Sequence, residues 1–583
     1  MSGRAPLYVV VGMGLCLACA GCRPEDWAGA KSPKAPDARK VPPEIQGTVG
    51  EYASLVGGGS LLLDGHGLVV GLGKNGSAEV PPRLKRYLVE YMLKQKVGSA
   101  LTGAGRITPS RIIADKDTAV VRLVAAVPPG APKGWTFDVR ATTLTRTGTR
   151  SLDGGTLYPF PLYLASGEDV APSSGARAWA RAAGSVFLNP FLDPEKPADA
   201  PRMREGRVIG GGKVVASRPL RLILRDPDYA RCNLIQRRIN QRFGQPRRVA
   251  NAKNPSTIEL TVPPSQHEDY EHFLQLVMHL PLQAGPGRWE SRARQVGEDM
   301  QKAGANHDGL SLVWEAMGRQ VIDVCRKLYA AKSPAVAFYS ARAGFRMRDE
   351  MAGEVLIRLA ETVGSPLQIP AIRELGRQRW LARSAPVLRR LVNDRSELVR
   401  VAAYEALVAL GDTSLVTRTD IGGEFQLDLV TSKRGYVIYA TQSREKKIVL
   451  FGRDMMVARG VFFDMENLVT IADKKERKDG KETGERKLMV FRTIPRTGGI
   501  SEAFYIDFHV RTLIETLGRP ARQGAGGKIE GLDLTYGQVV RVLYRMCEVD
   551  KDIPAKFVLQ QPPGRERIYR GAATVGRPDM PGD

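Results

Sequence analysis

Residues 55–76, LVGGGSLLLDGHGLVVGLGKNG, say more about the fold than any other stretch of this sequence. They set an apolar run of leucine and valine among eight glycines. Glycine at this density is typical of backbone that needs positive φ angles or that lies close to another backbone. We therefore expect a β-strand that is entered and left through tight bends.

Residues 71–76, GLGKNG, also match the GxGxxG pattern of phosphate-binding loops. In such a loop the last glycine opens a helix, but here residues 77–82 intervene and carry two prolines. The acidic residue that should follow about twenty positions on would be Glu90, which falls inside the helical run RLKRYLVEYMLK. A glycine-rich strand and turn is the commoner use of this composition, so we expect no nucleotide and no other cofactor.

Three further stretches follow the first in a recognisable order. Residues 120–140, VVRLVAAVPPGAPKGWTFDVR, predict a strand, a proline-rich turn and a second strand. Residues 151–158 read SLDGGTLY and contain a glycine pair. Residues 206–263 predict a strand, a helix at 229–243 and another strand.

Together these stretches resemble the flagellar P-ring protein family over residues 44–283. The family's N-terminal phrase, LxGxGLVVGLxGxG, stands here at residues 63–76, with Lys74 in place of one glycine. The resemblance implies a structural role for the glycine-rich positions. The candidate assembly motif consists of Gly65, Gly67, Gly71, Gly73, Gly76, Gly154 and Gly155.

The resemblance also implies a set of partners. In this family many copies close into a ring around the flagellar rod, in the periplasm at the peptidoglycan layer. We therefore expect a homo-oligomeric ring of this chain, with the rod, the L-ring proteins and peptidoglycan as further partners and no nucleic acid. Such a ring needs a head-to-tail interface that closes.

The N-terminus indicates export. Arg4 precedes an apolar run that ends in Cys19-Ala20-Gly21-Cys22, as in a secretory signal peptide. The Ala-Gly-Cys ending resembles a bacterial lipoprotein site, in which Cys22 would carry the lipid and anchor the chain to a membrane. Cys19, where such sites prefer leucine, leaves plain cleavage or an uncleaved anchor as alternatives. We expect a signal peptide at 1–21 and, from its composition, a flexible tether at 22–43.

Two further modules are expected beyond a P-ring-like region at 44–284. Residues 285–412 are predicted to be amphipathic helices that resemble HEAT repeats over 334–412, with a plain helical bundle as the alternative. Residues 413–583 alternate like strands and contain helical runs, which predicts an α+β domain of no family that we recognise. The expected fold class is multidomain α+β: a P-ring-like mixed α/β N-terminal half, an all-α middle and an α+β C-terminal domain.

Residues suited to catalysis or metal binding are hard to find. His272 and His279 lie two turns apart on one expected helix, but their spacing is not HExxH, and a partly exposed amphipathic helix is the simpler interpretation. Three cysteines remain beyond the signal, in three different regions, which argues against a disulfide framework. We therefore expect no catalytic residue and no bound metal, and we expect that the protein is not an enzyme.

The sequence is strongly basic, with 86 Lys and Arg against 62 Asp and Glu and a formal net charge of +24. This balance favours anionic partners such as the wall polymer, lipid head groups and acidic proteins. The basic residues are dispersed, which argues against nucleic acid, and the arginines at 237–248 are predicted to form a solvated helix face. The alternative function is a non-flagellar envelope lipoprotein scaffold that binds protein partners through its helical repeats.

Overall fold

The computed structural model describes residues 41–561, except for 58, 98–107, 129, 146, 166–175, 194–195, 218, 245–246, 268, 284, 466–467, 479–480, 495–498 and 523–529. The expected signal peptide, Cys22 and nearly all of the tether therefore lie outside the described residues. Residues from Pro43 onward form one compact unit. In the part of the chain that the structure describes, no helix is long and apolar enough to span a bilayer.

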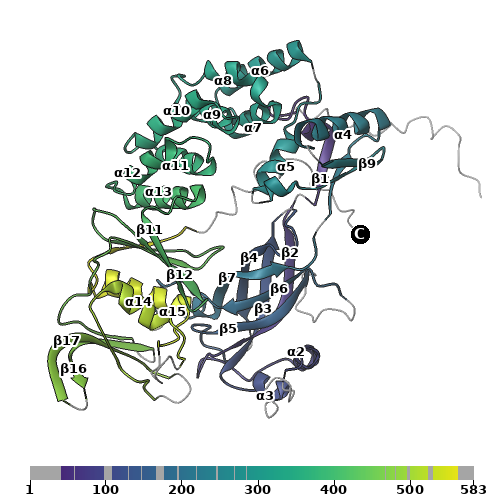
Figure 1. Cartoon of the computed structure of the whole chain (residues 1–583). Helices are drawn as coiled ribbons and strands as arrows, with labels where there is room; N and C mark the ends of the chain where they lie inside the picture. The colour runs from purple at the N-terminus through teal and green to yellow at the C-terminus, as the bar shows by residue number, and fades with distance from the viewer. Residues whose placement is uncertain are drawn as a thin grey trace, which may run out of the picture. The chain divides into compact units, whose positions relative to one another are not determined.

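A closed barrel with antiparallel pairing comes first (Figure 1). Fully buried side chains such as Leu68, Leu123 and Phe160 belong to its hydrophobic core, and residues of two helices, α2 (Pro82–Lys94) and α3 (Pro109–Ile113), join the same core. The strands run in the order β2-β3-β4-β7-β6-β5: β2 (Leu61–Val70), β3 (Thr118–Val127), β4 (Thr136–Thr143), β7 (Glu205–Val214), β6 (Ala180–Ser185) and β5 (Thr156–Leu164).

The barrel confirms the strand–turn–strand prediction for residues 120–140 and the helix that follows the glycine-rich stretch. It corrects another expectation. The proline- and serine-rich composition of residues 166–183 predicts a loop, but residues 180–185 form β6, which pairs with β5 and β7 and is needed to close the barrel. The centre of that expected loop, residues 172–175, lies outside the described residues.

A small antiparallel sheet covered by helices, the α/β layer, follows the barrel in sequence and also includes the residues just before it. Helix α4 (Tyr229–Phe243) has the predicted bounds, because the carboxylate of Asp228 accepts a hydrogen bond from the backbone N–H of Ala230 and caps the first turn. The sheet has the order β1-β8-β10-β9. The remaining elements are α1 (Val49–Tyr52), β1 (Ala53–Val56), β8 (Leu220–Leu224), β9 (Ala250–Asn254), β10 (Thr257–Leu260) and α5 (Tyr270–Met278).

The edge of this sheet at β9 is closed by α4. The side-chain oxygen of Asn240 accepts hydrogen bonds from the N–H groups of Val249 and Ala250, and its amide nitrogen donates to the carbonyl of Ala250. Gln236, one turn earlier, accepts from the N–H of Ala252. Covering an edge in this way prevents another strand from pairing there.

The helical array comes next and runs from residue 286 to residue 410. Val399, Ala403 and Leu407 are buried on one face of the last helix, as the helical spacing predicts. A glycine at position 376 predicts a break between helices, but Gly376 lies inside a helix, where an added Cβ would stand 2.6 Å from the Cα of Ala406. The helices are α6 (Pro286–Met300), α7 (His307–Met317), α8 (Ile322–Arg326), α9 (Pro334–Arg346), α10 (Glu350–Glu361), α11 (Gln368–Arg377), α12 (Ser384–Leu391) and α13 (Glu397–Leu410).

The C-terminal module, residues 416–559, contains a mixed five-stranded sheet of order β11-β12-β14-β13-β19 and a four-stranded sheet of order β15-β16-β17-β18. The first consists of β11 (Val416–Ile421), β12 (Phe425–Val430), β14 (Lys447–Phe451), β13 (Val437–Ala440) and β19 (Lys556–Leu559). The second consists of β15 (Phe462–Met465), β16 (Val469–Lys478), β17 (Lys481–Arg492) and β18 (Phe504–Ile506). The charged, glycine-bearing stretch at 474–487 predicts a solvated loop at the tip of a hairpin. β16 and β17 do form an antiparallel hairpin, but most of the stretch belongs to the two strands.

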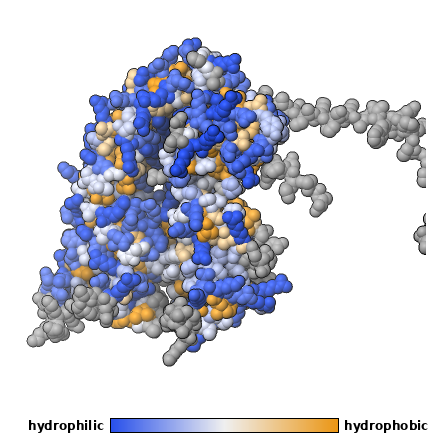
Figure 2. Space-filling view, turned by 45° about the vertical axis from the view of Figure 1, so that its right-hand side comes forward, coloured by the Kyte–Doolittle hydropathy of each residue, from blue (hydrophilic) through white to orange (hydrophobic). Residues whose placement is uncertain are grey.

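Two helices complete this module, α14 (Val510–Gly518) and α15 (Tyr536–Tyr544), and both lie where the sequence predicts helical runs. Helices and sheets together confirm the α+β fold class. Figure 2 shows one face of the molecule, on which hydrophilic residues cover most of the surface and hydrophobic ones are scattered between them. That distribution agrees with a chain of net charge +24.

Candidate functional site

The first two glycines of the assembly motif lie inside β2 and not in a bend. The predicted bend at the start of the strand is present, but it lies earlier in the chain, at Gly57, which has φ +86°. A Cβ on Gly65 would stand 2.8 Å from the carbonyl oxygen of Pro161 in β5, and one on Gly67 would stand 2.9 Å from the side chain of Leu157. Both positions need glycine because the wall of the closed barrel is crowded at the contact between β2 and β5.

The bend after β2 is present, as predicted. Gly71 has φ +81° and Gly73 has φ +62°, which residues with a side chain rarely adopt. The N–H of Gly73 donates to a carboxylate oxygen of Asp117 at 2.6 Å and fixes the turn. A Cβ on Gly76 would collide with the carbonyl oxygen of Thr118, so this glycine allows a close approach of two backbones.

The glycine pair before β5 lies next to that bend, because Val70 at the end of β2 pairs with Thr156 at the start of β5. A Cβ on Gly155 would meet the side chains of Val69 and Leu72, within the barrel. A Cβ on Gly154, which has φ +70°, would instead meet the side-chain amide of Gln538 in α15. The structure thus brings the turn glycines together at one end of the barrel and places α15 against them.

We call the contact between the barrel and the C-terminal module the barrel junction, and its centre is aromatic. Phe187 belongs to the barrel side but is 5% exposed and packs in the hydrophobic core of the C-terminal module. Its ring lies 5.8 Å from that of Tyr536, which also contacts Phe425. A buried aromatic anchor of this kind is typical of the residues that dominate an interface.

Polar contacts surround the anchor. Arg541 of α15 forms an ion pair with Asp153 at 2.6 Å, and the two residues lie 388 positions apart in sequence. Lys446 donates to the hydroxyl of Ser185 at 2.6 Å and forms an ion pair with Glu424 at 3.0 Å. The side chains of the two ion pairs are between 14% and 30% exposed. Water therefore reaches the rim of the barrel junction.

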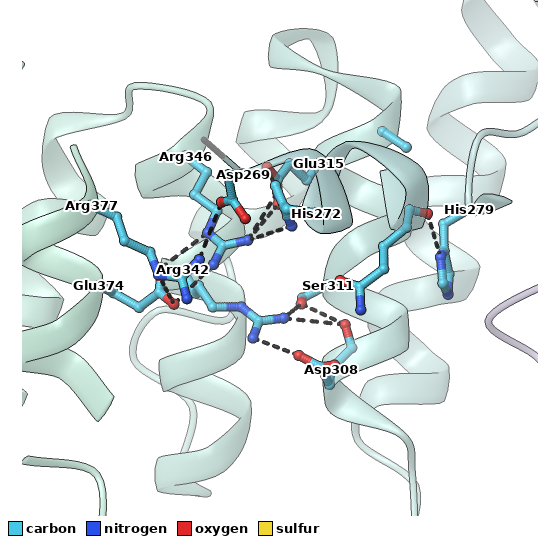
Figure 3. Close-up of polar contacts among 12 residues, drawn as sticks. Asp269, His272, His279, Asp308, Ser311, Glu315, Arg342, Arg346, Glu374 and Arg377 are labelled. Carbon is cyan, nitrogen blue, oxygen red and sulfur yellow. Dashed lines mark hydrogen bonds and ion pairs between the residues drawn. The ribbon is translucent and has the colours of Figure 1, made fainter. Parts of the chain in front are cut away.

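A second contact, the array junction, joins α5 of the α/β layer to the helical array (Figure 3). Arg346 of α9 lies at its centre and forms ion pairs with Glu374 of α11 at 2.9 Å and with Glu315 of α7 at 3.3 Å. His272 of α5 lies 2.6 Å from Glu315 through Nε2 and also contacts Arg346. Four helices therefore supply one buried network of charges.

Electrostatics explain why this network can be buried. Burial alone would raise the pKa of Glu315, but Arg346 and His272 outweigh it and lower that pKa to about 2. Burial likewise works against Glu374, whose pKa is nevertheless lowered by Arg346 and Arg377. For Arg346, burial lowers the pKa but the two carboxylates raise it above its ordinary value. Each charge is stable only because its partners are present.

The edges of the network reach the surface. Arg377 pairs with Asp269, just before α5, at 3.3 Å, and Arg342 pairs with Asp308 at 2.6 Å and donates to Ser311. These contacts appear with the buried ones in Figure 3. They extend the array junction from the α/β layer across α7 and α9.

The structure revises two expectations for residues of this region. His272 and His279 are both largely buried, with His279 just beyond the end of α5, where its Nδ1 lies 2.8 Å from the carbonyl of Gln275. Within the described ranges, no group of histidine, cysteine and acidic residues is arranged to hold a metal ion. Of the arginines expected on a solvated face, Arg238 lies over the ring of Trp289 at 4.7 Å and Arg242 donates to the carbonyls of Glu315 and Ala316, so both bind the array to α4.

Comparison with known proteins finds a family model that matches part of the first half of the chain. Residues 49–288 match the family model of the flagellar P-ring protein. The resemblance expected from the sequence over residues 44–283 is therefore confirmed. We call the matched residues, 49–288, the P-ring-family region. It contains the barrel and the α/β layer, and its helix α5 supplies His272 to the array junction.

Named relatives agree with the family match. The flagellar P-ring protein of Anaeromyxobacter dehalogenans is 29% identical over 374 residues, which cover 62% of this chain and 89% of that protein. The flagellar P-ring protein of Thermotoga maritima is 29% identical over 235 residues, covering 38% of this chain and 62% of that protein. The one from Geotalea uraniireducens is 30% identical over 219 residues, covering 36% and 52%. The chain is thus longer than the Anaeromyxobacter relative that it matches.

Sequence reasoning missed the residues that hold the modules together. Glu315, Arg346 and Glu374 are charged residues on the buried faces of amphipathic helices, and this break in the helical pattern was the available signal. Arg541 and Asp153 gave no signal of their own, because each is an ordinary surface-type residue whose partner lies far away in sequence.

Proposed function

We propose that this protein is a structural component of the bacterial flagellar basal body, and that its P-ring-family region builds a ring of many copies around the rod in the periplasm. The match of residues 49–288 to the flagellar P-ring family carries the proposal. The relatives' names support it, since each is a flagellar P-ring protein. A family of this kind has a structural role, so the proposal includes no catalysis.

The proposed partners are further copies of the chain, the rod, the L-ring proteins and peptidoglycan. The net charge of +24 supports a neighbour that carries negative charge, as the wall polymer does. In a ring the interface between copies is heterologous, because the same two different surfaces meet at every contact.

The helical array and the C-terminal module would enlarge each subunit of the ring. The barrel junction and the array junction bury aromatic and charged residues, so the helical array and the C-terminal module are part of one folded body with the P-ring-family region. A truncated chain that ends near residue 286 would leave Phe187 and His272 without their partners. The test of function therefore uses the full chain.

Imaging of isolated basal bodies tests the proposal. Cells that lack the protein should lose a ring of the basal body and their motility, and the full chain supplied in trans should restore both. A tag on the full chain should place it in that ring by negative-stain electron microscopy. A chain that is strictly monomeric and absent from basal bodies would overturn the proposal.

Membrane attachment through Cys22 is a separate part of the proposal. Mass spectrometry of the mature N-terminus should find an acylated Cys22 as the first residue, and Cys22→Ser should release the protein from membranes. An unmodified N-terminus at another residue would reject the anchor and leave the proposed ring unaffected.

The second candidate is an envelope scaffold that binds a protein partner through the helical array. The long region beyond residue 288 favours it, and Met351 and Val363 of this region are large apolar side chains that are 57% and 79% exposed. Val363→Glu should then abolish capture of a partner from envelope extracts while motility is unchanged. If cells without the protein are non-motile, or if Val363→Glu still captures the partner, the scaffold hypothesis fails.

A further inference from the structure

Two crossings of the chain connect the barrel to the rest of the molecule, and they lie side by side. The first follows β1 and contains Gly57, and the second precedes β8 and contains Pro219. An added Cβ on Gly57 would stand 2.8 Å from the carbonyl oxygen of Pro219. Gly57 has φ +86°, a conformation that glycine adopts without strain. A pair of short crossings at one point has the geometry of a hinge.

The rest of the chain holds together without the barrel. The array junction joins the α/β layer to the helical array through Arg346, Glu315 and Glu374. The helical array is joined in turn to the C-terminal module, because Tyr404 of α13 donates to the carboxylate of Asp428 at 2.5 Å and both are buried. Near this contact, Tyr439 donates to Glu405 at 2.6 Å.

We call the surface of the C-terminal module that contacts the barrel, residues 424–446 and α15, the seat. The seat belongs to one body with the α/β layer and the helical array, and the barrel is attached to that body by the hinge. Near the hinge, Trp135 packs edge-on against Tyr270 of α5 at 5.3 Å. Gly130 also lies against Leu220 of β8, where an added Cβ would stand 2.9 Å from its side chain. The barrel junction adds the contacts of Phe187 with Tyr536 and of Asp153 with Arg541. The contacts of the barrel junction would be the same whichever copy supplied the barrel.

We propose that in the assembled protein the barrel of each copy fills the seat on the C-terminal module of the next copy. Exchange of a segment between identical chains reuses contacts that already fit, so it costs little beyond the opening of the hinge. Each copy then gives one barrel and receives one, which makes the contact head-to-tail and lets a series of copies close into a ring.

This inference rests on the proposed ring and adds the identity of its interface. The partner surface is residues 424–446 and α15 of a second copy, with Phe187 as the anchor residue that is exchanged. It also assigns the glycine turn at Gly154 a place between two copies, because that turn contacts Gln538 across the same junction.

Cross-linking between two marked copies tests the exchange. One copy carries Asp153→Cys and a first tag, the other carries Arg541→Cys and a second tag, and both are full chains in the same cells. A short bismaleimide should link the two tags to each other, because the replaced side chains are 2.6 Å apart across the barrel junction. Copies without introduced cysteines show what the native thiols contribute.

A matched pair provides the control. Glu397→Cys in one copy and Lys556→Cys in the other lie across a contact between the helical array and the C-terminal module that does not exchange, so they should give no link between the tags. In a single chain with both Asp153→Cys and Arg541→Cys, exchange should give a ladder of linked chains on a denaturing gel. The corresponding Glu397→Cys/Lys556→Cys chain should give only a monomer linked within itself.

The outcomes separate this inference from the proposed function. Rings seen by electron microscopy together with linked tags support both. Rings with links only inside single chains overturn the exchange and leave the ring in place. Linked tags in dimers without rings support the exchange and reject the ring, and the absence of both rings and linked tags rejects both proposals.

Discussion

The array junction and the barrel junction join parts of the same chain by different chemistry. At the array junction Arg346, Glu315 and Glu374 keep no more than a tenth of their side-chain surface exposed, and each needs the others to stay charged. At the barrel junction the buried centre is the aromatic pair Phe187 and Tyr536. An apolar anchor can leave its partner and return, whereas a buried charge that loses its partners pays a large desolvation cost. The comparison indicates a permanent junction and an exchangeable one.

Removing the central charge of the array junction should have the largest effect. Arg346→Met leaves Glu315 and Glu374 buried without their shared partner, and we expect a loss of about 3–5 kcal/mol in the stability of the array. Hydrogen exchange of α7, α9 and α11 measures it locally, as a chain of several modules requires. Arg383→Met is the matched control, because Arg383 pairs with Glu354 at the surface. It should cost about 1 kcal/mol or less, and equal effects of the two variants would contradict the distinction drawn here.

Truncation of the anchor should have the next largest effect. Phe187→Ala empties a buried site between barrel and C-terminal module, with an expected loss of about 3 kcal/mol. Faster hydrogen exchange in α15 should report it. Phe191→Ala is the control, because Phe191 is 50% exposed and contacts Tyr544 of the same helix. That change should cost about 1 kcal/mol. If Phe191→Ala costs more stability than Phe187→Ala, Phe187 is not the anchor of the barrel junction.

Features of the fold that depend on neighbouring residues could be predicted from the sequence, and features that depend on residues far apart in the chain could not. Helix α4 could be placed to the residue, because its cap at Asp228 and its apolar period are both local. Closure of the barrel could not be predicted, because a glycine in a strand and a glycine in a bend look alike in sequence. Only the pairing of β2 with β5 shows that Gly65 is needed for close packing against Pro161 and not for a turn. Strand β9, ANAKN, lacks the β-branched residues that mark strands and was missed.

The candidate site shows the same limit. The glycines could be predicted because the family resemblance rests on short contiguous motifs. Their common location beside α15 could not be predicted, because it depends on residues far away in sequence. The array junction combines charges from four helices, and no single helix predicts which carboxylate meets Arg346. The assembly role of the glycines and the HEAT-like character of the array stay predictions.

Acid should weaken the array junction by less than Arg346→Met does, because protonating Glu315 still leaves Glu374 to pair with Arg346. The pKa of Glu315 is lowered to about 2, mainly by Arg346 against the opposing effect of burial. A carboxyl whose pKa is lower in the folded state stabilises the fold above its ordinary pKa, and this contribution is lost as the pH falls from about 4.5 to about 2. Unfolding followed by tryptophan fluorescence should show a stability that declines in that window. Glu315→Gln should flatten this part of the curve, and an unchanged slope would show that other carboxyls cause it.

A smaller effect should come from the glycine turn that touches α15. Gly154→Ala and Gly71→Ala both place a side chain at positive φ, for which we expect about 1–2 kcal/mol in each case. They differ in surroundings, because the nearest atom to an added Cβ on Gly71 is 4.0 Å away, whereas on Gly154 it would collide with Gln538.

Displacing Gln538 also disturbs the start of α15, where its side chain accepts from the N–H of Thr535 in a capping box. We therefore expect Gly154→Ala to cost about 1 kcal/mol more than Gly71→Ala. Denaturant unfolding of Gly154→Ala, Gln538→Ala and the double variant forms a cycle that isolates this contact. If Gln538→Ala removes the extra cost, the glycine is needed because α15 packs on the turn. If the extra cost persists, backbone strain alone explains the glycine, and the turn has no part in the barrel junction.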